Sequence, residues 1–164
     1  MNFHLKPIPD EDVDAFFDMV RDPSLSFNTG SIPVGIDRDW AVNRLKERRA
    51  EEEKGTRADR GLYDGETLVG IASWFYNEHG HMEIGYAIHR DHRGNGLATR
   101  AAVMIVDMLQ NDGFTGPIYA QYYQDNEASG RVLEKLGFEK DVLIEEHSAV
   151  RGGMYSSWIV KLEP

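Results

Sequence analysis

The pattern of apolar and polar positions divides this chain into segments of two kinds. Apolar residues at every second position predict strands, and apolar residues three or four positions apart predict one face of a helix. The seven predicted strands cover Phe3–Ile8, Ala58–Tyr63, Thr67–Tyr76, His81–Ile88, Ile118–Tyr123, Phe138–Glu146 and Met154–Leu162. The four predicted helices cover Asp10–Val20, Asp37–Lys54, Gly96–Asn111 and 126–136. The resulting order, β-α-α-β-β-β-α-β-α-β-β, predicts an α/β (α+β) fold with helices on the faces of a mixed sheet.

Three local predictions refine this scheme. Asp10 is expected to cap the helix that it opens. The segment Asp22–Gly35 is rich in Ser, Asn, Gly and Pro, which predicts a loop whose apolar residues either form a wall of a substrate pocket or pack onto the core. In the helix Asp37–Lys54, the stretch E-R-R-A-E-E-E-K is interpreted as a solvated face with internal ion pairs and not as a binding patch.

Composition excludes several classes of function. The chain has 164 residues, which suits a single domain, and 18 basic residues against 28 acidic ones give a formal net charge of −10. Such a surface repels nucleic acid and anionic membranes, so neither is expected as a partner. Absence of cysteine excludes disulfides and thiolate metal sites, and the Asp, Glu and His residues show no metal-ligand spacing, so no metal is expected. The N-terminus lacks the apolar core of a signal peptide and no apolar run approaches the ~20 residues of a membrane helix, which favours a cytoplasmic protein.

The candidate chemistry is concentrated where the strand ending at Ile88 leads into the helix that starts near Gly96. A turn that opens a helix leaves backbone N–H groups unpaired, and the helix dipole adds positive charge there, so the turn suits a phosphate. Gly94 and Gly96 permit close approach of the backbone, and Arg93 can add a charged donor. The alternative is a plain junction in which the glycines only permit the turn. A phosphate-binding loop of the G-x-x-x-x-G-K-[ST] type is absent, and G-N-G-L-A-T lacks the third glycine of a dinucleotide site.

Two segments carry a resemblance to a known family. Residues 93–98, R-G-N-G-L-A, resemble the acetyl-coenzyme A-binding motif of the GNAT N-acetyltransferase superfamily, with Arg93, Gly96 and Ala98 at its fixed positions. Residues 125–138 resemble the segment N-x-x-S-x-R-V-L-x-K-x-G-F of the ribosomal-protein (RimJ/RimL-like) branch of that superfamily. The matching residues are Asn126, Ser129, Arg131, Lys135, Gly137 and Phe138. Gly130 departs from the usual bulkier residue and should weaken its helix by about 1 kcal/mol relative to Ala.

The resemblance implies a single N-acetyltransferase domain over residues 1–164, with a mostly antiparallel central sheet. It implies direct transfer of an acetyl group from acetyl-coenzyme A (acetyl-CoA) to a primary amine, either a protein N-terminus or a small molecule. The alternatives are a catalytically silent acyl-CoA sensor and a nucleotide-binding module that uses the same turn. Relatives in this superfamily are often homodimers, so a homodimer is left open. The residues expected to bind the coenzyme are Ile88, Arg93, Gly94, Asn95, Gly96, Leu97, Ala98 and Asn126.

Within that group, the backbone N–H groups of residues 93–98 are expected to hold the diphosphate. The backbone N–H of Ile88 is expected to stabilise the oxyanion of the tetrahedral transition state. Asn126 either caps its helix or holds a pantetheine carbonyl. Arg131 either meets a phosphate or is a solvated helix residue.

The catalytic candidates are Glu83 and Ser129. Glu83 can take the ammonium proton, directly or through water; the other interpretation is a strand carboxylate that faces solvent. His81 and His89 are alternative bases, since imidazole titrates near neutrality. The Ser129 hydroxyl has either the coenzyme sulfur or a backbone carbonyl one turn earlier as its partner. Tyr86 and Tyr122 are interpreted as core or pocket-wall residues.

Overall fold

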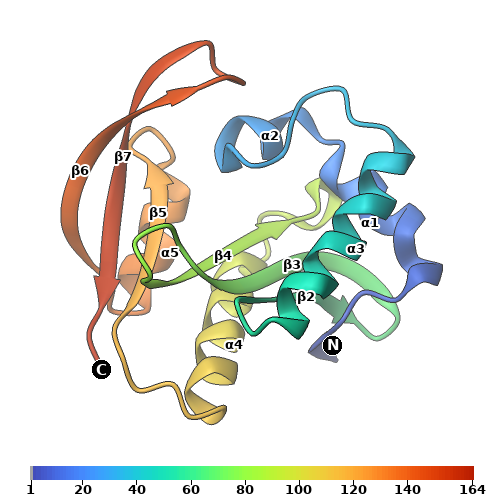
Figure 1. Ribbon diagram of the computed structural model, residues 1–164, viewed down its shortest axis with the longest axis horizontal. Coiled ribbons are helices and arrows are strands. Elements are labelled where there is room, and N and C mark those ends of the chain that lie inside the picture. The colour runs from blue at the N-terminus through green and yellow to red at the C-terminus, as the bar shows by residue number, and fades with distance from the viewer. Residues whose placement is uncertain (1) are drawn as a thin grey trace.

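The computed structural model of the protein describes residues 2–164, and its centre is one seven-stranded sheet in the order β1-β2-β3-β4-β5-β7-β6 (Figure 1). The strands are β1 (Phe3–Lys6), β2 (Arg57–Asp64), β3 (Thr67–Tyr76), β4 (Met82–Ile88), β5 (Ile118–Tyr123), β6 (Glu139–Ser148) and β7 (Gly153–Leu162). The helices are α1 (Val13–Val20), α2 (Pro23–Thr29), α3 (Arg38–Glu53), α4 (Leu97–Asn111) and α5 (Glu127–Lys135), with short 3-10 turns at Asp10–Asp12 and Arg90–His92. The predicted α/β fold with a mixed, mostly antiparallel sheet is confirmed.

The junction of β4 and β5 divides the sheet. All other neighbouring strands are antiparallel, whereas β4 and β5 are parallel and pair only at Met82–Ile118 and Glu83–Tyr119. Beyond these pairs the two strands diverge, as Figure 1 shows. The remaining length of β4 therefore has a ladder partner on the β3 side only.

Helices cover both faces of the sheet, and each face has its own apolar core. On one face α4 and α5 contribute Ile105 and Leu133 to a buried cluster that includes Ile84 of β4. On the other face α1, α2 and α3 pack over a second cluster, which includes Ala87 of the same strand. Alternate side chains of β4 thus enter opposite cores, as the period-two pattern predicts. Within residues 2–164 no helix combines the length and the apolarity that crossing a membrane requires.

The predicted loop Asp22–Gly35 is wrong in its first half, which forms α2. Asp22 is the residue before this helix, and its carboxylate accepts a hydrogen bond from the backbone N–H of Ser24 at 3.0 Å. Pro23 occupies the first turn, where a missing N–H costs nothing, and Gly30 ends the helix with φ of +68°. Cap residues at both ends of a seven-residue helix gave this segment a loop-like composition.

The expected cap at Asp10 is also wrong. The chain enters α1 through the 3-10 turn Asp10–Asp12, and neither this turn nor α1 has a side-chain cap at its start. The Asp10 carboxylate instead accepts a hydrogen bond from Arg49 of α3 at 2.7 Å. The Asp12 carboxylate accepts one from the hydroxyl of Tyr63 at 2.7 Å. Tertiary contacts to α3 and β2 therefore replace the local cap.

Candidate active site

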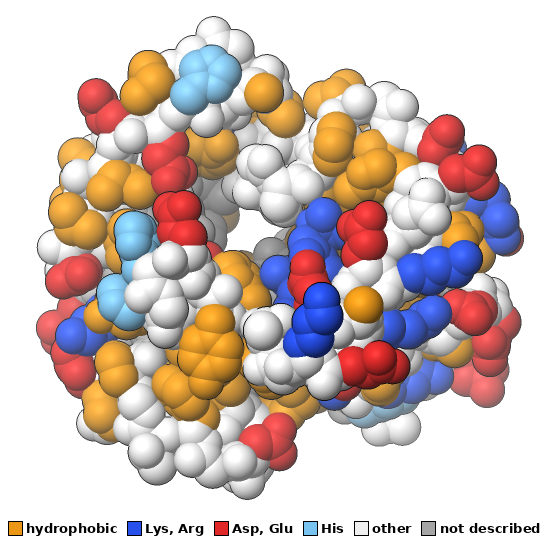
Figure 2. All heavy atoms as spheres, viewed as in Figure 1, with side chains coloured by type: hydrophobic (Ala, Val, Ile, Leu, Met, Phe, Trp, Pro, Cys, Tyr) orange, Lys and Arg blue, Asp and Glu red, His pale blue; other side chains and the backbone are white. Residues whose placement is uncertain are grey.

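A cavity of about 1170 Å³ passes from one side of the sheet to the other through the gap between β4 and β5. On one side it is lined by the turn before α4 and by α5, and on the other by α2, α3, the start of β2 and the second half of β3. In the space-filling view the surface is hollowed at this place, with Lys and Arg side chains along its rim (Figure 2). Two reactants entering from opposite sides could therefore meet beside β4.

The turn before α4 presents uncapped backbone amides to the cavity. Gly94 and Gly96 have φ of +83° and +74°, and beyond the adjacent backbone no atom lies within 4 Å of where a Cβ would stand on either. The helices α2, α3 and α5 have side-chain caps at their N-termini, from Asp22, Asp37 and Asn126, whereas α4 begins at Gly96 without one. The N-terminus of α4 therefore keeps its hydrogen-bond donors and its partial positive charge available to an anion.

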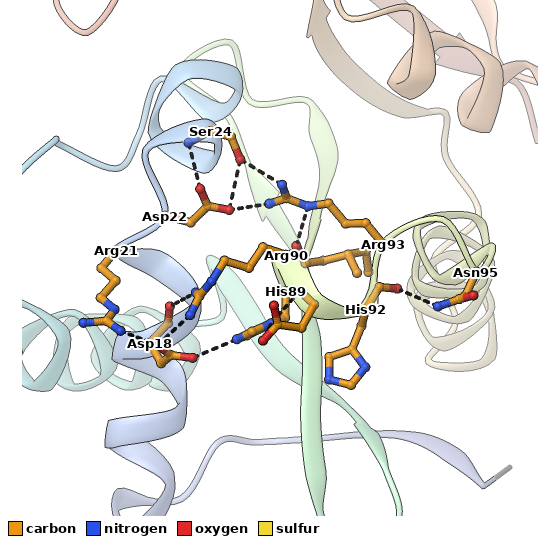
Figure 3. A network of polar contacts seen from close by, with 11 residues as sticks. Asp18, Arg21, Asp22, Ser24, His89, Arg90, His92, Arg93 and Asn95 are labelled. Atoms are coloured by element: carbon orange, nitrogen blue, oxygen red, sulfur yellow. Dashed lines mark hydrogen bonds and ion pairs between the residues drawn. The ribbon is translucent and has the colours of Figure 1, made fainter.

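The Arg93 guanidinium fixes this turn through hydrogen bonds to neighbouring segments of the protein. Its Nε donates to the carbonyl of Ile88 at 3.1 Å, and its two terminal nitrogens donate to Ser24 and Asp22 at 2.9 and 2.7 Å (Figure 3). Burial opposes the charge on Asp22, but the bonds from Ser24 and Arg93 outweigh it and lower the pKa of the carboxyl. In this structure Arg93 therefore holds the end of β4 against the start of α2.

The two histidines considered as bases lie outside the reacting region. His89 is buried; its Nε2 lies 2.9 Å from an oxygen of Asp18, and its Nδ1 accepts the backbone N–H of Asp91 (Figure 3). Hydrogen bonds from His89 and Arg90 hold the pKa of Asp18 well below its usual range. His81 is exposed and stacks on Tyr119 at 4.5 Å between ring centroids. Both ring nitrogens of His89 are thus occupied in fixing the turn after β4.

The register of β3 and β4 aims the amide of Ile88 at the gap. The backbone N–H of His89 donates to the carbonyl of Val69 on the β3 side at 2.9 Å. Hydrogen-bonding directions alternate along an antiparallel ladder, so the amides of Tyr86 and Ile88 point away from β3 and towards β5. Because β4 and β5 pair only at Met82 and Glu83, those amides border the cavity without a ladder partner.

Glu83 lies on the face of β4 that forms part of the cavity wall on the α3 side. The side chain is half-buried and lines the cavity, and its carboxylate accepts a hydrogen bond from Asn77 at 3.3 Å. Burial raises the pKa of Glu83, and the bond from Asn77 offsets this only in part. Glu83 is therefore a partly buried carboxylate in the wall of the cavity. A carboxylate with a raised pKa is a better proton acceptor than an ordinary glutamate.

Ser129 and Tyr86 meet on the opposite side of the gap. The two hydroxyl oxygens are 2.9 Å apart, so Tyr86 is the partner of Ser129 in this structure, in place of the backbone carbonyl that was one of its two predicted partners. Burial raises the pKa of Tyr86 to about 12, which keeps the phenol protonated. Asn126 caps α5 by accepting the backbone N–H of Ser129 at 3.4 Å. Both hydroxyls and Asn126 line the cavity.

Two further residues of α5 have clear surroundings. A Cβ on Gly130 would stand 3.0 Å from the ring and hydroxyl of Tyr122, so glycine here lets the buried Tyr122 pack against the helix backbone. Arg131 is exposed and lies 3.9 Å from Glu127 one turn earlier, and it also lines the cavity, within which a phosphate could reach it.

The contribution of α3 to the cavity was not predicted from the sequence. Trp40, Arg44 and Arg48 recur every fourth position and so share one face of the helix, and all three line the cavity. The expected ion pair within the helix exists, since Arg48 lies 3.0 Å from Glu51. The view that residues 47–54 form only a solvated face is nevertheless wrong, because the side chain of Arg48 is 15% exposed. The four-residue spacing was the signal available in the sequence.

Comparison with known proteins relates the chain to one family. A family model described as "Acetyltransferase (GNAT) domain" matches residues 2–139. The uncharacterized N-acetyltransferase YoaA of Bacillus subtilis is 26% identical over 156 residues, covering 93% of this chain and 88% of the relative. The [ribosomal protein uS5]-alanine N-acetyltransferase of Escherichia coli is 28% identical over 97 residues, which cover 56% of this chain and 50% of the enzyme.

The fold is also found among solved structures. The coenzyme A complex of RimL, a ribosomal L7/L12 alpha-N-protein acetyltransferase, superimposes with a TM-score of 0.89 at 12% sequence identity. The alignment covers 99% of this chain and 94% of that one. At so low an identity the likeness concerns the fold alone.

Proposed function

Since the chain belongs to the acetyltransferase (GNAT) domain family and is an N-acetyltransferase that uses acetyl-CoA, we propose that it transfers the acetyl group directly to an amine within the cavity between β4 and β5. The observation that carries the proposal is the passage of one cavity from the uncapped turn of α4 to the face of β4 that holds Glu83. The coenzyme is assigned to the α4 side and the amine to the α3 side.

The coenzyme site is assigned to the turn and the open edge of β4. The amides of residues 93–98 would hold the diphosphate, because they combine unpaired donors with the positive end of a helix dipole. The gap offers the pantetheine arm the free amides of β4, and Ile88 would donate to the carbonyl oxygen as negative charge develops there. The Asn126 amide borders the same path. Arg93 is assigned a positioning role, since its guanidinium is bonded to Ile88, Ser24 and Asp22.

Glu83 is proposed as the base. It would take a proton from the substrate ammonium, directly or through a water molecule, and the neutral nitrogen would then attack the thioester carbonyl carbon. The carbon–sulfur bond breaks as the tetrahedral intermediate collapses, and the sulfur leaves with the electron pair. The raised pKa of Glu83 supports this role, because burial has made its carboxylate more basic.

Ser129 is proposed to serve the leaving group. With the Tyr86 hydroxyl donating to Ser129, the hydrogen of the Ser129 hydroxyl is free to point at the departing sulfur. Burial keeps Tyr86 protonated up to about its pKa of 12, so the pair remains a donor across the working range of an enzyme. The proton balance closes when the nitrogen, which is cationic after its attack, loses a second proton to solvent, Ser129 gives its proton to the sulfur and regains one from solvent, and Glu83 releases its proton to solvent.

Two acceptor classes remain within the proposal, a protein N-terminal amine and a small-molecule amine. The E. coli relative is named as an enzyme that acetylates an alanine of ribosomal protein uS5, which supports the first class. The proposal includes a cytoplasmic location.

The test is thiol release from acetyl-CoA with a panel of N-terminal peptides and small amines. We expect turnover with at least one class. We also expect Glu83→Gln to lower kcat/KM roughly 100-fold or more and to remove the acid limb of its pH profile, as loss of a general base does. Glu134→Gln, which changes a carboxylate on α5, is the matched control and should leave the profile unchanged. Coenzyme binding without turnover on any amine would instead indicate the silent acyl-CoA sensor.

A further inference from the structure

The α3 side of the cavity carries positive charge that the molecule as a whole does not. The chain has a formal net charge of −10, yet three arginines line this part of the cavity: Arg44 and Arg48 from α3 and Arg57 from β2. Basic side chains are visible at the rim of the hollow (Figure 2). A local concentration of guanidinium groups in an acidic protein requires a partner for their charge.

Protein carboxylates neutralise two of the three. Arg57 donates to Asp59 at 2.6 Å, and Arg48 donates to Glu51 at 3.0 Å and lies 3.7 Å from Asp59. The Nε of Arg48 is nevertheless buried without a hydrogen-bond acceptor. The local carboxylates are therefore already shared among the guanidinium groups of this wall.

Arg44 is the one arginine of the three without a carboxylate partner among residues 2–164. Among residues 2–164 it forms no ion pair, and its guanidinium lies 5.2 Å from the centre of the Trp40 ring, half-buried beside the cavity. Burial and the charges of Arg48 and Arg57 lower its pKa to about 10, so the guanidinium stays charged at neutral pH but in an unfavourable environment. An anion bound here would relieve that repulsion.

The floor of this half of the cavity leads from Arg57, whose charge acts on Arg44, to the proposed base. Arg57, Phe75 and Glu83 are direct neighbours across β2, β3 and β4, so their side chains lie on one face of the sheet. Two strand spacings put Arg57 and Glu83 about 10 Å apart at Cα. The next row holds Ser73 and Gly85, whose small side chains leave room above the strands. One acceptor molecule can therefore contact both Glu83 and the arginines on the α3 side of the cavity.

We propose that the acceptor is an amine that also carries a carboxylate or phosphate, and that Arg44 binds this anionic group while the amine lies beside Glu83. The proposal rests on the proposed function and names its substrate class. The separation of the two walls favours an acceptor in which several bonds join the amine to the anion. An acidic side chain near a peptide N-terminus and a small amino acid share this chemistry.

Two matched acceptor pairs test the proposal and distinguish the sources. The small pair is β-alanine against β-alaninamide, and the peptide pair is Ala-Glu-Gly amide against Ala-Gln-Gly amide. For the pair that fits the site, we expect kcat/KM to be roughly 10- to 100-fold higher for the anionic member. This factor corresponds to the free energy of one hydrogen bond to a charged group. Arg44→Gln should abolish that preference, and Arg44→Lys should restore part of it. Arg38→Gln, on the same helix but bonded to Asp14 outside the cavity, should keep it.

Binding measured by calorimetry to the coenzyme A-loaded protein gives a second readout, which does not depend on turnover. Equal binding and turnover of both members of each pair would overturn the proposal, as would a preference that survives Arg44→Gln in a protein with unchanged melting. Absence of binding for every probe would overturn it as well. Failure of the proposed function looks different: no amine, charged or neutral, would then release thiol.

Discussion

Arg151 is predicted to hold the β6–β7 hairpin against α2, and its replacement by Ala tests how the far wall of the cavity is fixed. The side chain is 0% exposed. Its guanidinium donates to the carbonyl of Phe27 at 2.9 Å, to Asn28 at 3.2 Å and to Asp125 at 2.7 Å. It also lies 3.8 and 3.7 Å from the ring centres of Phe27 and Tyr123. One side chain thus joins three segments that are distant in sequence.

The size of the effect follows from these contacts. Two hydrogen bonds from a charged donor to the α2 segment contribute about 1.5–3 kcal/mol each, and desolvated contact with an aromatic ring adds up to about 2 kcal/mol. Asp125 is 59% exposed, so its ion pair contributes about 1 kcal/mol at most. Removing the buried cation also recovers a desolvation cost of several kcal/mol. We therefore expect Arg151→Ala to lower the free energy of unfolding by about 3 kcal/mol.

Urea denaturation measures this loss, and acceptor kinetics show whether it reaches the site. Residues of both α2 and the end of β6 line the cavity, so a loosened hairpin should raise KM for the amine more than it lowers kcat. Arg151→Lys should lie between the two proteins, because it keeps the charge and loses the planar fork. Lys140→Ala on the same hairpin, an exposed cation over Trp158, should cost about 1 kcal/mol or less. A loss below about 1 kcal/mol for Arg151→Ala would refute the reasoning.

Three further predictions concern the site. Asn77→Asp replaces the amide that faces Glu83 with a carboxylate. The added negative charge should raise the pKa of Glu83 further and so move the acid limb of kcat/KM to higher pH. An unmoved or lowered limb would contradict the assignment of the base. Gly96→Val should abolish the protection that coenzyme A gives the protein in thermal melting. Gly65 is also at positive φ with open space around it, so both substitutions should cost about 1–2 kcal/mol of backbone strain. Gly65→Val should nevertheless keep that protection. Gly130→Ala should destabilise the protein by about 1 kcal/mol in urea denaturation, although Ala has the better helix propensity. The reason is that the new Cβ would stand 3.0 Å from the buried ring of Tyr122. A stabilised variant would show that this ring moves freely.

The elements that the sequence predicted well are those with a strong period. Alternation along β4 and the helical spacing of α4 are both local signals, and the structure has these elements at the expected positions. The helix α2 was missed because its caps, Asp22 and Gly30, have the same composition as a turn. Short helices whose ends make up most of their length have no interior in which a period can be seen.

The site was predictable only where one segment contains the chemistry. The glycines before α4 signal an open N-terminus from their own spacing. In contrast, the side-chain partners of Arg93 lie at the start of α2, about 70 positions earlier, and those of Ser129 and Glu83 lie in other strands or turns. The role of Arg44 was invisible for the same reason: its spacing from Trp40 marks a shared face, but only the packing of α3 over β2 turns that face towards the cavity.

The central claim is that the amides before Leu97 hold the diphosphate of the coenzyme while its thioester lies in the gap beside Ile88. A crystal structure of the protein with acetyl-CoA measures this most directly. We predict diphosphate oxygens within hydrogen-bond distance of the amides between Gly94 and Ala98, and the thioester carbonyl oxygen within that distance of the Ile88 amide. A coenzyme bound elsewhere, or one whose thioester lies outside the gap between β4 and β5, would contradict the account.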